Sequence, residues 1–177
     1  MINKYKEFTS ANMRNSNSNP NYRYNKDFKP STIKYEEHLL NADEVANYII
    51  YLSKQLGKPF VNNLQLQKIL FFIQKDYYKE YGKVLFINQL YAWDYGPVFK
   101  SCYYKYNNQG ICALMNYEFT PFVLIESDIH SFIMKELEKY INYSSLELSE
   151  MSKREKCWIK NYEKGKENII PVEDLAL

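Results

Sequence analysis

The stretch NLQLQKILFFIQKDYYKEY, residues 63–81, predicts the helix around which the domain is built. Apolar side chains recur in it at the spacing of one helix face, at Leu66, Ile69, Leu70, Ile73 and Tyr77. Phe71 and Phe72 extend the apolar surface beyond that face, which is typical of a helix in the centre of a core. Gly82 is expected to end the helix, because glycine readily adopts the left-handed conformation of a C-cap.

A shorter amphipathic helix is expected to precede this central one. Asn41 can cap it, with Glu44 in the third position of a capping box. Apolar residues then follow at helical spacing, at Val45, Ile49, Leu52 and Leu56. Gly57 and Pro59 mark its end.

The residues after the central helix change to an extended pattern. Residues 84–87 and 90–93 are apolar and flank Asn88-Gln89, so we expect a short β-hairpin or two extended strands. Gly96-Pro97 predicts a turn, and Pro97 can open a helix over residues 98–106. Residues 111–123 have no clear period and predict a loop with a short strand.

The C-terminal part predicts further short helices. Ser127 can cap a helix whose apolar positions are Ile129, Ile133, Leu137 and Ile141. Ser144 and Glu147 form a second capping box, which opens a helix that reaches Met151.

The last residues complete the predicted fold. We expect Trp158 in a loop or turn, residues 168–171 in an extended segment and residues 171–174 in a last short helix. These patterns predict a mainly α fold of the α+β kind, a compact helical domain with a small β-hairpin that covers residues 41–177.

The first 34 residues differ from the rest in composition and charge. They carry seven Lys and Arg against two acidic residues, a balance of +5, whereas residues 35–177 carry sixteen against nineteen, a balance of −3. Residues 12–25 hold almost nothing apolar, so burial cannot offset the entropy lost on ordering them. We therefore expect residues 1–40 to form a flexible basic arm, which is either dispensable or wraps a partner.

Composition restricts the class of protein. With 177 residues, of which 46% are hydrophobic, the chain can bury a core, and its net charge of +2 is no signature of a nucleic-acid partner. Cys102, Cys112 and Cys157 are odd in number and form no CxxC pair, which favours reduced thiols. No apolar run approaches the roughly 18 residues of a membrane span, and no signal peptide is visible. We expect a cytoplasmic protein without a membrane partner.

Two blocks of residues follow a known pattern. The first contains Leu66-Gln-Lys-Ile-Leu70, Gln74, Tyr81-Gly-Lys83, Leu85-Phe86, Ala92-Trp93, Tyr95-Gly-Pro-Val98 and Tyr104. The second contains Leu148-Ser-Glu-Met151, Trp158 and Asn168-Ile-Ile-Pro171. In content and order both blocks resemble the Panacea family of SocA-like antitoxin domains. The resemblance covers about residues 41–175 and leaves the arm outside.

The resemblance implies a non-enzymatic domain that neutralises a cognate protein toxin by forming a complex with it. Members of this family also occur in prophages, and one branch is an adaptor that delivers a toxin to a protease. The chain departs from the family pattern at two places. Ser152-Lys153 stands where the family usually has Thr-His, and Cys157 stands where it has Pro, so no role of that histidine carries over to Lys153.

Candidate partner-binding residues occur in both parts of the chain. In the domain they are Trp93, Asp94, Tyr95, Gly96, Pro97, Lys153 and Trp158, and in the arm Arg14, Tyr22, Arg23 and Tyr24. Trp, Tyr and Arg are frequent anchors of protein interfaces. The alternative for residues 93–97 is structural, because Gly permits an unusual φ, Pro fixes the start of a helix and aromatic rings pack beneath the corner. Trp158 can likewise fill an edge of the core.

The sequence predicts no catalytic, cofactor or metal site. It contains no Gly-rich phosphate loop, GxSxG or HExxH motif, and His38 and His130 are isolated. The basic cluster at residues 153–166 is interrupted by Glu155 and Glu163 and is either a solvated surface or a phosphate-contacting patch.

Four alternatives to toxin neutralisation are considered. The chain could be a phage-encoded, anti-defence inhibitor of a host defence nuclease or a proteolytic adaptor. It could also be a nucleic-acid-binding regulator that uses the basic arm, or an enzyme without a visible motif. Salt dependence would mark the regulator, because phosphate contacts weaken steeply with salt.

Overall fold

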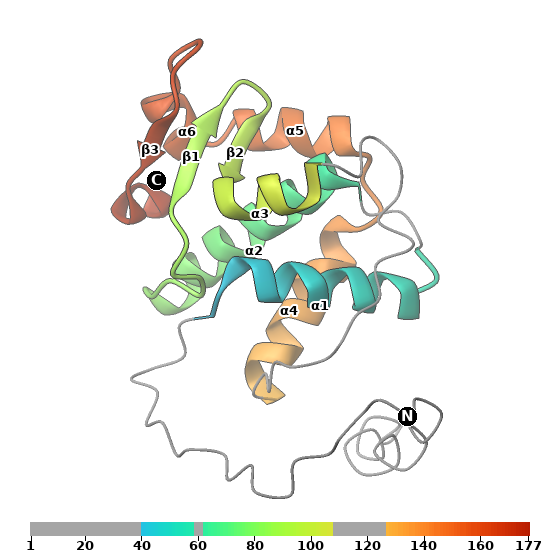
Figure 1. The fold of residues 1–177 in the computed structure, drawn as a ribbon. Coiled ribbons are helices and arrows are strands. Elements are labelled where there is room, and N and C mark those ends of the chain that lie inside the picture. Colours follow the sequence, from blue (N-terminus) through green and yellow to red (C-terminus); the bar gives the residue numbers. More distant parts are fainter. Residues whose placement is uncertain (1–39, 59–61, 108–126) are drawn as a thin grey trace, which may run out of the picture. The chain divides into compact units, whose positions relative to one another are not determined.

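The computed structural model of the chain describes residues 40–58, 62–107 and 127–177. Helices predominate in these ranges, and a small three-stranded antiparallel sheet lies beside them (Figure 1). The elements follow in the order α1 (Ala42–Gln55), α2 (Asn63–Tyr81), β1 (Leu90–Trp93), β2 (Gly96–Phe99), α3 (Lys100–Tyr106), α4 (Ser127–Tyr140), α5 (Ser145–Lys153), α6 (Lys156–Asn161), β3 (Asn168–Ile170) and the 3₁₀ helix η4 (Val172–Ala176). The predicted class, mainly helical with a small sheet, is confirmed.

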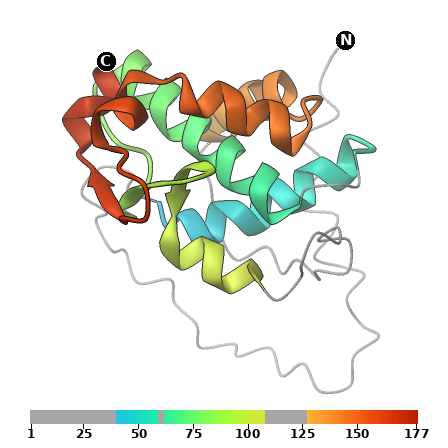
Figure 2. The ribbon, with the colours of Figure 1, turned by 90° about the horizontal axis from the view of Figure 1, so that it is seen from above.

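Helix α2 runs through the middle of the domain, between α5 on one side and α1 and α3 on the other (Figure 2). The Asn62 side chain caps it by accepting a 2.8 Å hydrogen bond from the Gln65 amide, and Gly82 ends it at a φ of 67°. Residues 65–75 are buried without interruption, so α2 is enclosed on all sides along this length. The prediction of a central helix that ends at Gly82 is confirmed.

The buried polar side chains of α2 bind the backbone of neighbouring segments. Gln74 accepts hydrogen bonds from the amides of Leu85 and Phe86 at 2.9 and 2.8 Å. Gln67 accepts one from the amide of Phe99 at 3.0 Å. Buried backbone groups need partners, and the side chains of α2 supply them for these three amides.

The sheet has the order β2-β1-β3, and both pairings are antiparallel. Strands β1 and β2 pair from Leu90↔Phe99 to Trp93↔Gly96, so the hairpin turn is formed by residues 94 and 95. Pro97 fits in β2 because an edge strand can place a residue without an N–H on its open side.

Two predictions about the hairpin were wrong. Residues 84–87 do not form its first strand, because Gln74 binds their backbone and Phe86 instead forms a single bridge with Leu40. Gly96-Pro97 is not a turn, and Pro97 does not open a helix. Both residues pair with β1, and α3 begins only at Lys100.

The other local predictions have mixed outcomes. The Ser144–Glu147 capping box of α5 is confirmed in both of its hydrogen bonds, at 2.7 and 3.2 Å. Asn41 caps α1, although its side chain accepts from Asp43 rather than Glu44. Trp158 lies in helix α6 and not in a loop, because Glu155 begins another helical turn after α5. The extended segment β3 and the short helix η4 are confirmed.

Residues 1–39 of the predicted arm and the predicted loop over residues 111–123 lie outside the described residues, whereas Leu40 forms the bridge with Phe86. Within the described ranges, no helix combines the length and apolar character needed to cross a membrane.

Candidate functional site

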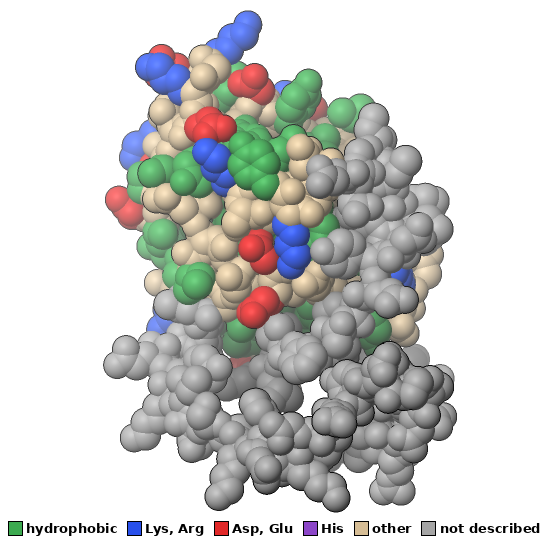
Figure 3. Space-filling view, viewed as in Figure 1, with side chains coloured by type: hydrophobic (Ala, Val, Ile, Leu, Met, Phe, Trp, Pro, Cys, Tyr) green, Lys and Arg blue, Asp and Glu red, His purple; other side chains and the backbone are tan. Residues whose placement is uncertain are grey.

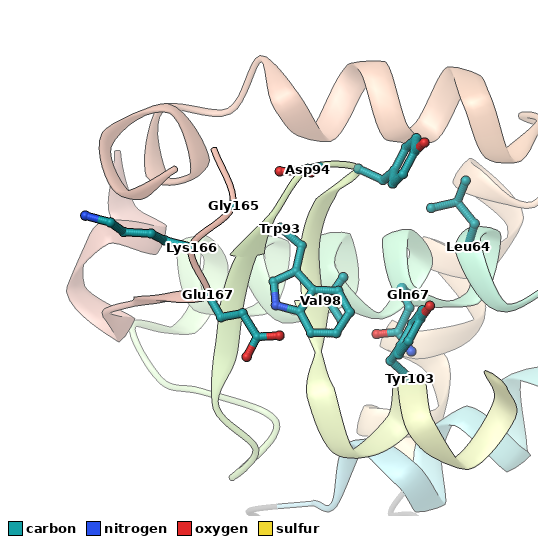
Figure 4. Close-up of a pocket in the computed structure, with 10 residues that line it drawn as sticks. Leu64, Gln67, Trp93, Asp94, Val98, Tyr103, Gly165, Lys166 and Glu167 are labelled. Atoms are coloured by element: carbon teal, nitrogen blue, oxygen red, sulfur yellow. The ribbon is translucent and has the colours of Figure 1, made fainter. Parts of the chain in front are cut away.

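An open hollow of about 410 Å³ lies beside the β1–β2 turn, and Trp93 stands in its centre (Figure 4). Helix α2 lines it with Leu64 and Gln67, β2 with Val98 and α3 with Tyr103. The turn and residues 165–167 complete the lining. Segments far apart in the sequence therefore meet at this hollow.

Aromatic rings form the rim of the hollow. Trp93 packs edge-to-face against Tyr103, with ring centroids 4.9 Å apart, and lies 6.3 Å from Tyr104. Tyr95 and Tyr104 are 66% and 55% exposed, although they are large apolar residues. Figure 3 shows a hydrophobic patch over β1 and β2 with acidic and basic side chains at its border. Such aromatic side chains are typical anchors of protein interfaces.

The backbone of the corner requires glycine at position 96. Gly96 has a φ of 93°, and a Cβ atom built there would collide with Ser152 Oγ and lie 3.1 Å from Lys68 Nζ. Lys68 is fully buried and donates a 2.7 Å hydrogen bond to the carbonyl of Pro97. Burial, with a smaller effect of the positive charge of Lys153, holds the pKa of Lys68 well below its usual value.

Helices α5 and α6 fix the position of the turn through hydrogen bonds to its backbone. Ser149 of α5 donates a 2.9 Å hydrogen bond to the carbonyl of Tyr95, and Trp158 of α6 donates one of 3.0 Å from Nε1 to the carbonyl of Trp93. The Trp158 ring stacks on Tyr162, with centroids 4.2 Å apart. The two sequence blocks singled out above therefore pack against each other, and together they fix the turn.

Acidic groups lie at the edge of the hollow. Asp94 is exposed and accepts a 3.0 Å hydrogen bond from the Tyr162 hydroxyl, which raises the pKa of Tyr162. Glu167 pairs with Lys100. Lys166 pairs with Glu163 at 2.7 Å, and Figure 4 shows its side chain pointing away from Trp93.

The indole N–H of Trp93 is the unsatisfied group of the site. Its Nε1 is buried and has no hydrogen-bond acceptor among the described residues. Figure 4 shows this nitrogen on the side of Glu167, with Tyr103 on the opposite side of the indole. A buried donor without an acceptor is unusual in proteins and calls for a structural or functional explanation.

The structure brings most of the predicted domain residues together. Trp93, Asp94 and Tyr95 line the hollow, Gly96 and Pro97 lie buried beneath it, and Trp158 supports the turn from behind. Lys153 is not in the lining and pairs with Glu150 at 2.5 Å on the surface of α5. The arm candidates Arg14, Tyr22, Arg23 and Tyr24 lie outside the described residues.

Sequence reasoning did not assign Lys68, Tyr103 or Glu167 to the site. Lys68 carried a local signal, because it lies between Gln67 and Ile69 on the apolar stretch of the central helix. Tyr103 and Glu167 carried none, since only the fold brings α3 and the segment before β3 to the turn.

The cysteines and the histidine of the described residues are buried or hydrogen-bonded. Burial raises the pKa of the Cys102 thiol to about 12 and that of Cys157 to about 11, so neither thiol is a ready nucleophile. His130 Nδ1 lies 2.5 Å from the Tyr48 hydroxyl. In the part of the chain that the structure describes, no three His, Cys, Asp or Glu side chains gather as metal ligands.

Comparison with known proteins identifies the family. The sequence model of the family "Antitoxin SocA-like, Panacea domain" matches residues 66–159, which are 94 of the 177 residues. No curated protein and no solved structure matches the chain. The match begins in α2 and ends in α6, so it contains the turn and the helices that hold it. The chain belongs to the SocA-like antitoxin family with the Panacea domain.

Proposed function

We propose that this chain is a non-enzymatic, cytoplasmic antitoxin that neutralises a cognate protein toxin by binding it in a stoichiometric complex. Membership of the antitoxin family carries this proposal. The docking face is the aromatic rim of the hollow, formed by Trp93, Tyr95, Tyr103 and Tyr104.

The geometry of the rim supports this location. Tyr95 and Tyr104 expose large rings that carry few rotatable bonds and therefore lose little entropy on binding. The hydrogen bonds from Ser149 and Trp158 hold the turn in place before a partner arrives. A pre-organised aromatic face of this kind favours protein recognition over catalysis.

Co-expression with the product of the adjacent gene tests the proposal. We expect the neighbouring product to arrest growth, the chain to restore growth, and the two proteins to co-purify. Replacing Tyr95 and Tyr104 together by Ala should abolish rescue and leave the melting temperature unchanged, because both side chains are exposed. Tyr143→Ala removes a ring that is 42% exposed away from the hollow and serves as the matched control.

Three other outcomes would change the proposal. Rescue by the double variant would move the docking face elsewhere, and the arm with Arg14, Tyr22, Arg23 and Tyr24 would be tested next. Rescue that requires a host protease would identify an adaptor. Absence of both toxicity and a complex would contradict the toxin partner and favour an inhibitor of a host defence nuclease.

A further inference from the structure

We propose that the hollow at Trp93 receives an arginine side chain of the partner protein, held between the indole ring and the carboxylate of Asp94. The inference rests on the proposed function, because the arginine belongs to the protein that the chain neutralises. It names the chemistry that this face recognises.

The balance of charge at the hollow is negative. The Asp94 carboxylate is exposed, and no Lys or Arg of the described residues forms an ion pair with it. Glu167 forms an ion pair with Lys100. Lys166 forms an ion pair with Glu163, and its side chain points away from Trp93. Asp94 is thus the uncompensated charge of the lining, and complementarity requires a cation on the partner.

The aromatic surface beside Asp94 selects the kind of cation. Trp93 stands in the centre of the hollow, and the indole is the ring over which a cation is most strongly attracted. A guanidinium is planar and less strongly hydrated than an ammonium, so it stacks on a ring while it donates to a carboxylate. These properties favour arginine over lysine.

The dimensions of the hollow favour one anchoring side chain. A volume of about 410 Å³ lies at the low end of pockets that bind small ligands, which reach roughly 1,000 Å³. This volume is sufficient for an arginine side chain with the adjoining main chain.

The indole N–H signal of Trp93 provides the readout, because it responds to a ligand that stacks on the ring. The chain contains two Trp residues, Trp93 and Trp158, so a ¹⁵N-labelled sample gives two indole signals, and Trp93→Phe identifies the first. The probe is acetyl-Ala-Ala-Arg-Ala-Ala-amide, titrated into the full chain. The same peptide with citrulline keeps the shape of arginine without its charge.

We expect a saturable shift of the Trp93 indole signal with the arginine peptide. The citrulline peptide should bind about tenfold more weakly or not at all, a change of about 1.4 kcal/mol. Asp94→Asn keeps the size of the side chain and should weaken binding of the arginine peptide to a similar extent. Glu173→Gln removes an exposed carboxylate outside the hollow, and its binding should equal that of the wild type.

Three results would overturn the inference: no shift with the arginine peptide, equal binding of the citrulline peptide, or equal binding by Asp94→Asn. The co-expression assay separates this failure from failure of the proposed function. If Asp94→Asn neutralises the toxin as well as the wild type does, the antitoxin function stands and the arginine site is wrong. If no toxin partner is found, the titration still decides whether the hollow recognises arginine.

Discussion

Gly96 combines a left-handed φ of 93° with the tightest surroundings of any described glycine. Lys68 and Ser152, from two different helices, lie where a side chain would begin. At Gly57, Gly82 and Gly165 φ is also positive, but nothing lies within 4 Å of the Cβ position. The requirement for glycine at the corner therefore has a conformational and a steric part, and the second is absent at the other three positions.

Gly96→Ala separates the two parts when it is compared with Gly165→Ala. We expect Gly165→Ala to cost about 1 kcal/mol from the unfavourable φ alone. Gly96→Ala should lower the free energy of unfolding by about 2–3 kcal/mol, because the methyl group also displaces Ser152 or Lys68. Urea unfolding of both variants measures the difference, and equal losses would show that the packing at Gly96 adds nothing.

At the scale of single elements, short sequence patterns predicted those helices and caps that are stabilised by contacts between residues close in the sequence. The central helix, its glycine C-cap and the capping box of α5 follow from patterns within about ten residues, and the structure contains all three. Residues 84–87 do not form the predicted strand, because Gln74 of α2 accepts hydrogen bonds from the amides of Leu85 and Phe86. No local pattern encodes that contact.

The candidate site was predictable in part for the same reason. Trp93, Asp94 and Tyr95 are consecutive and form a recognisable corner, so sequence reasoning reached them. Their supports, Lys68 and Ser149, lie 27 residues before Tyr95 and 54 residues after it, and only the packed helices reveal their roles. A sequence without its fold does not show which distant side chains meet at a turn.

Helices α2 and α4 are joined by a cluster of charged and hydroxyl groups. Asp76 of α2 accepts hydrogen bonds from Lys139 at 2.8 Å and from Tyr140 at 2.7 Å. Burial alone would raise the pKa of Asp76, but these hydrogen bonds lower it below its usual 3.8. Burial and the neighbouring Asp76 raise the pKa of Glu136 above its usual 4.5. As the pH falls, Glu136 therefore takes up a proton before Asp76 does.

Glu136→Gln tests this pairing through the pH dependence of stability. A raised pKa in the fold means that the contribution of Glu136 is complete below pH 4.5 and is lost as the pH rises through the raised value. Gln stays neutral, so the variant should be more stable than the wild type at neutral pH by about 1 kcal/mol. The difference should shrink as the pH falls to 4.5, a range that lies above the titration of Asp76.

Chemical unfolding between pH 4.5 and 7 measures the effect of Glu136→Gln. Glu138→Gln changes an exposed carboxylate on the same helix and should leave stability unchanged. A difference between Glu136→Gln and the wild type that does not vary with pH would contradict the raised pKa of Glu136.

At the scale of the whole molecule, the domain holds a core that extends from Ala42 to Leu175. Residues 1–34 contribute +5 to the charge of the chain, and their removal leaves a net charge of −3. We expect a chain without residues 1–34 to unfold cooperatively at a melting temperature close to that of the full chain. A fall of more than about 5 °C, equivalent to roughly 1 kcal/mol, would show that the arm stabilises the domain.

The same truncation measures what the basic arm contributes to neutralisation. If the aromatic hollow is sufficient, the truncated chain rescues growth as the full chain does. Loss of rescue at an unchanged melting temperature would assign part of the binding to the arm.

The sheet has a consequence for how the protein is made. Strand β1, which carries Trp93, lies in the middle of the sheet and pairs on one side with residues 168–170, near the far end of the sequence. The ribosome must therefore synthesise past Ile170 before the turn acquires both its neighbouring strand and the helix that holds it. Contacts over such a separation form late in folding, so a nascent chain that stops earlier offers no finished surface to a partner. Neutralising capacity at the proposed docking face is expected to arise in one step, once residues 168–170 have been synthesised and have paired with β1.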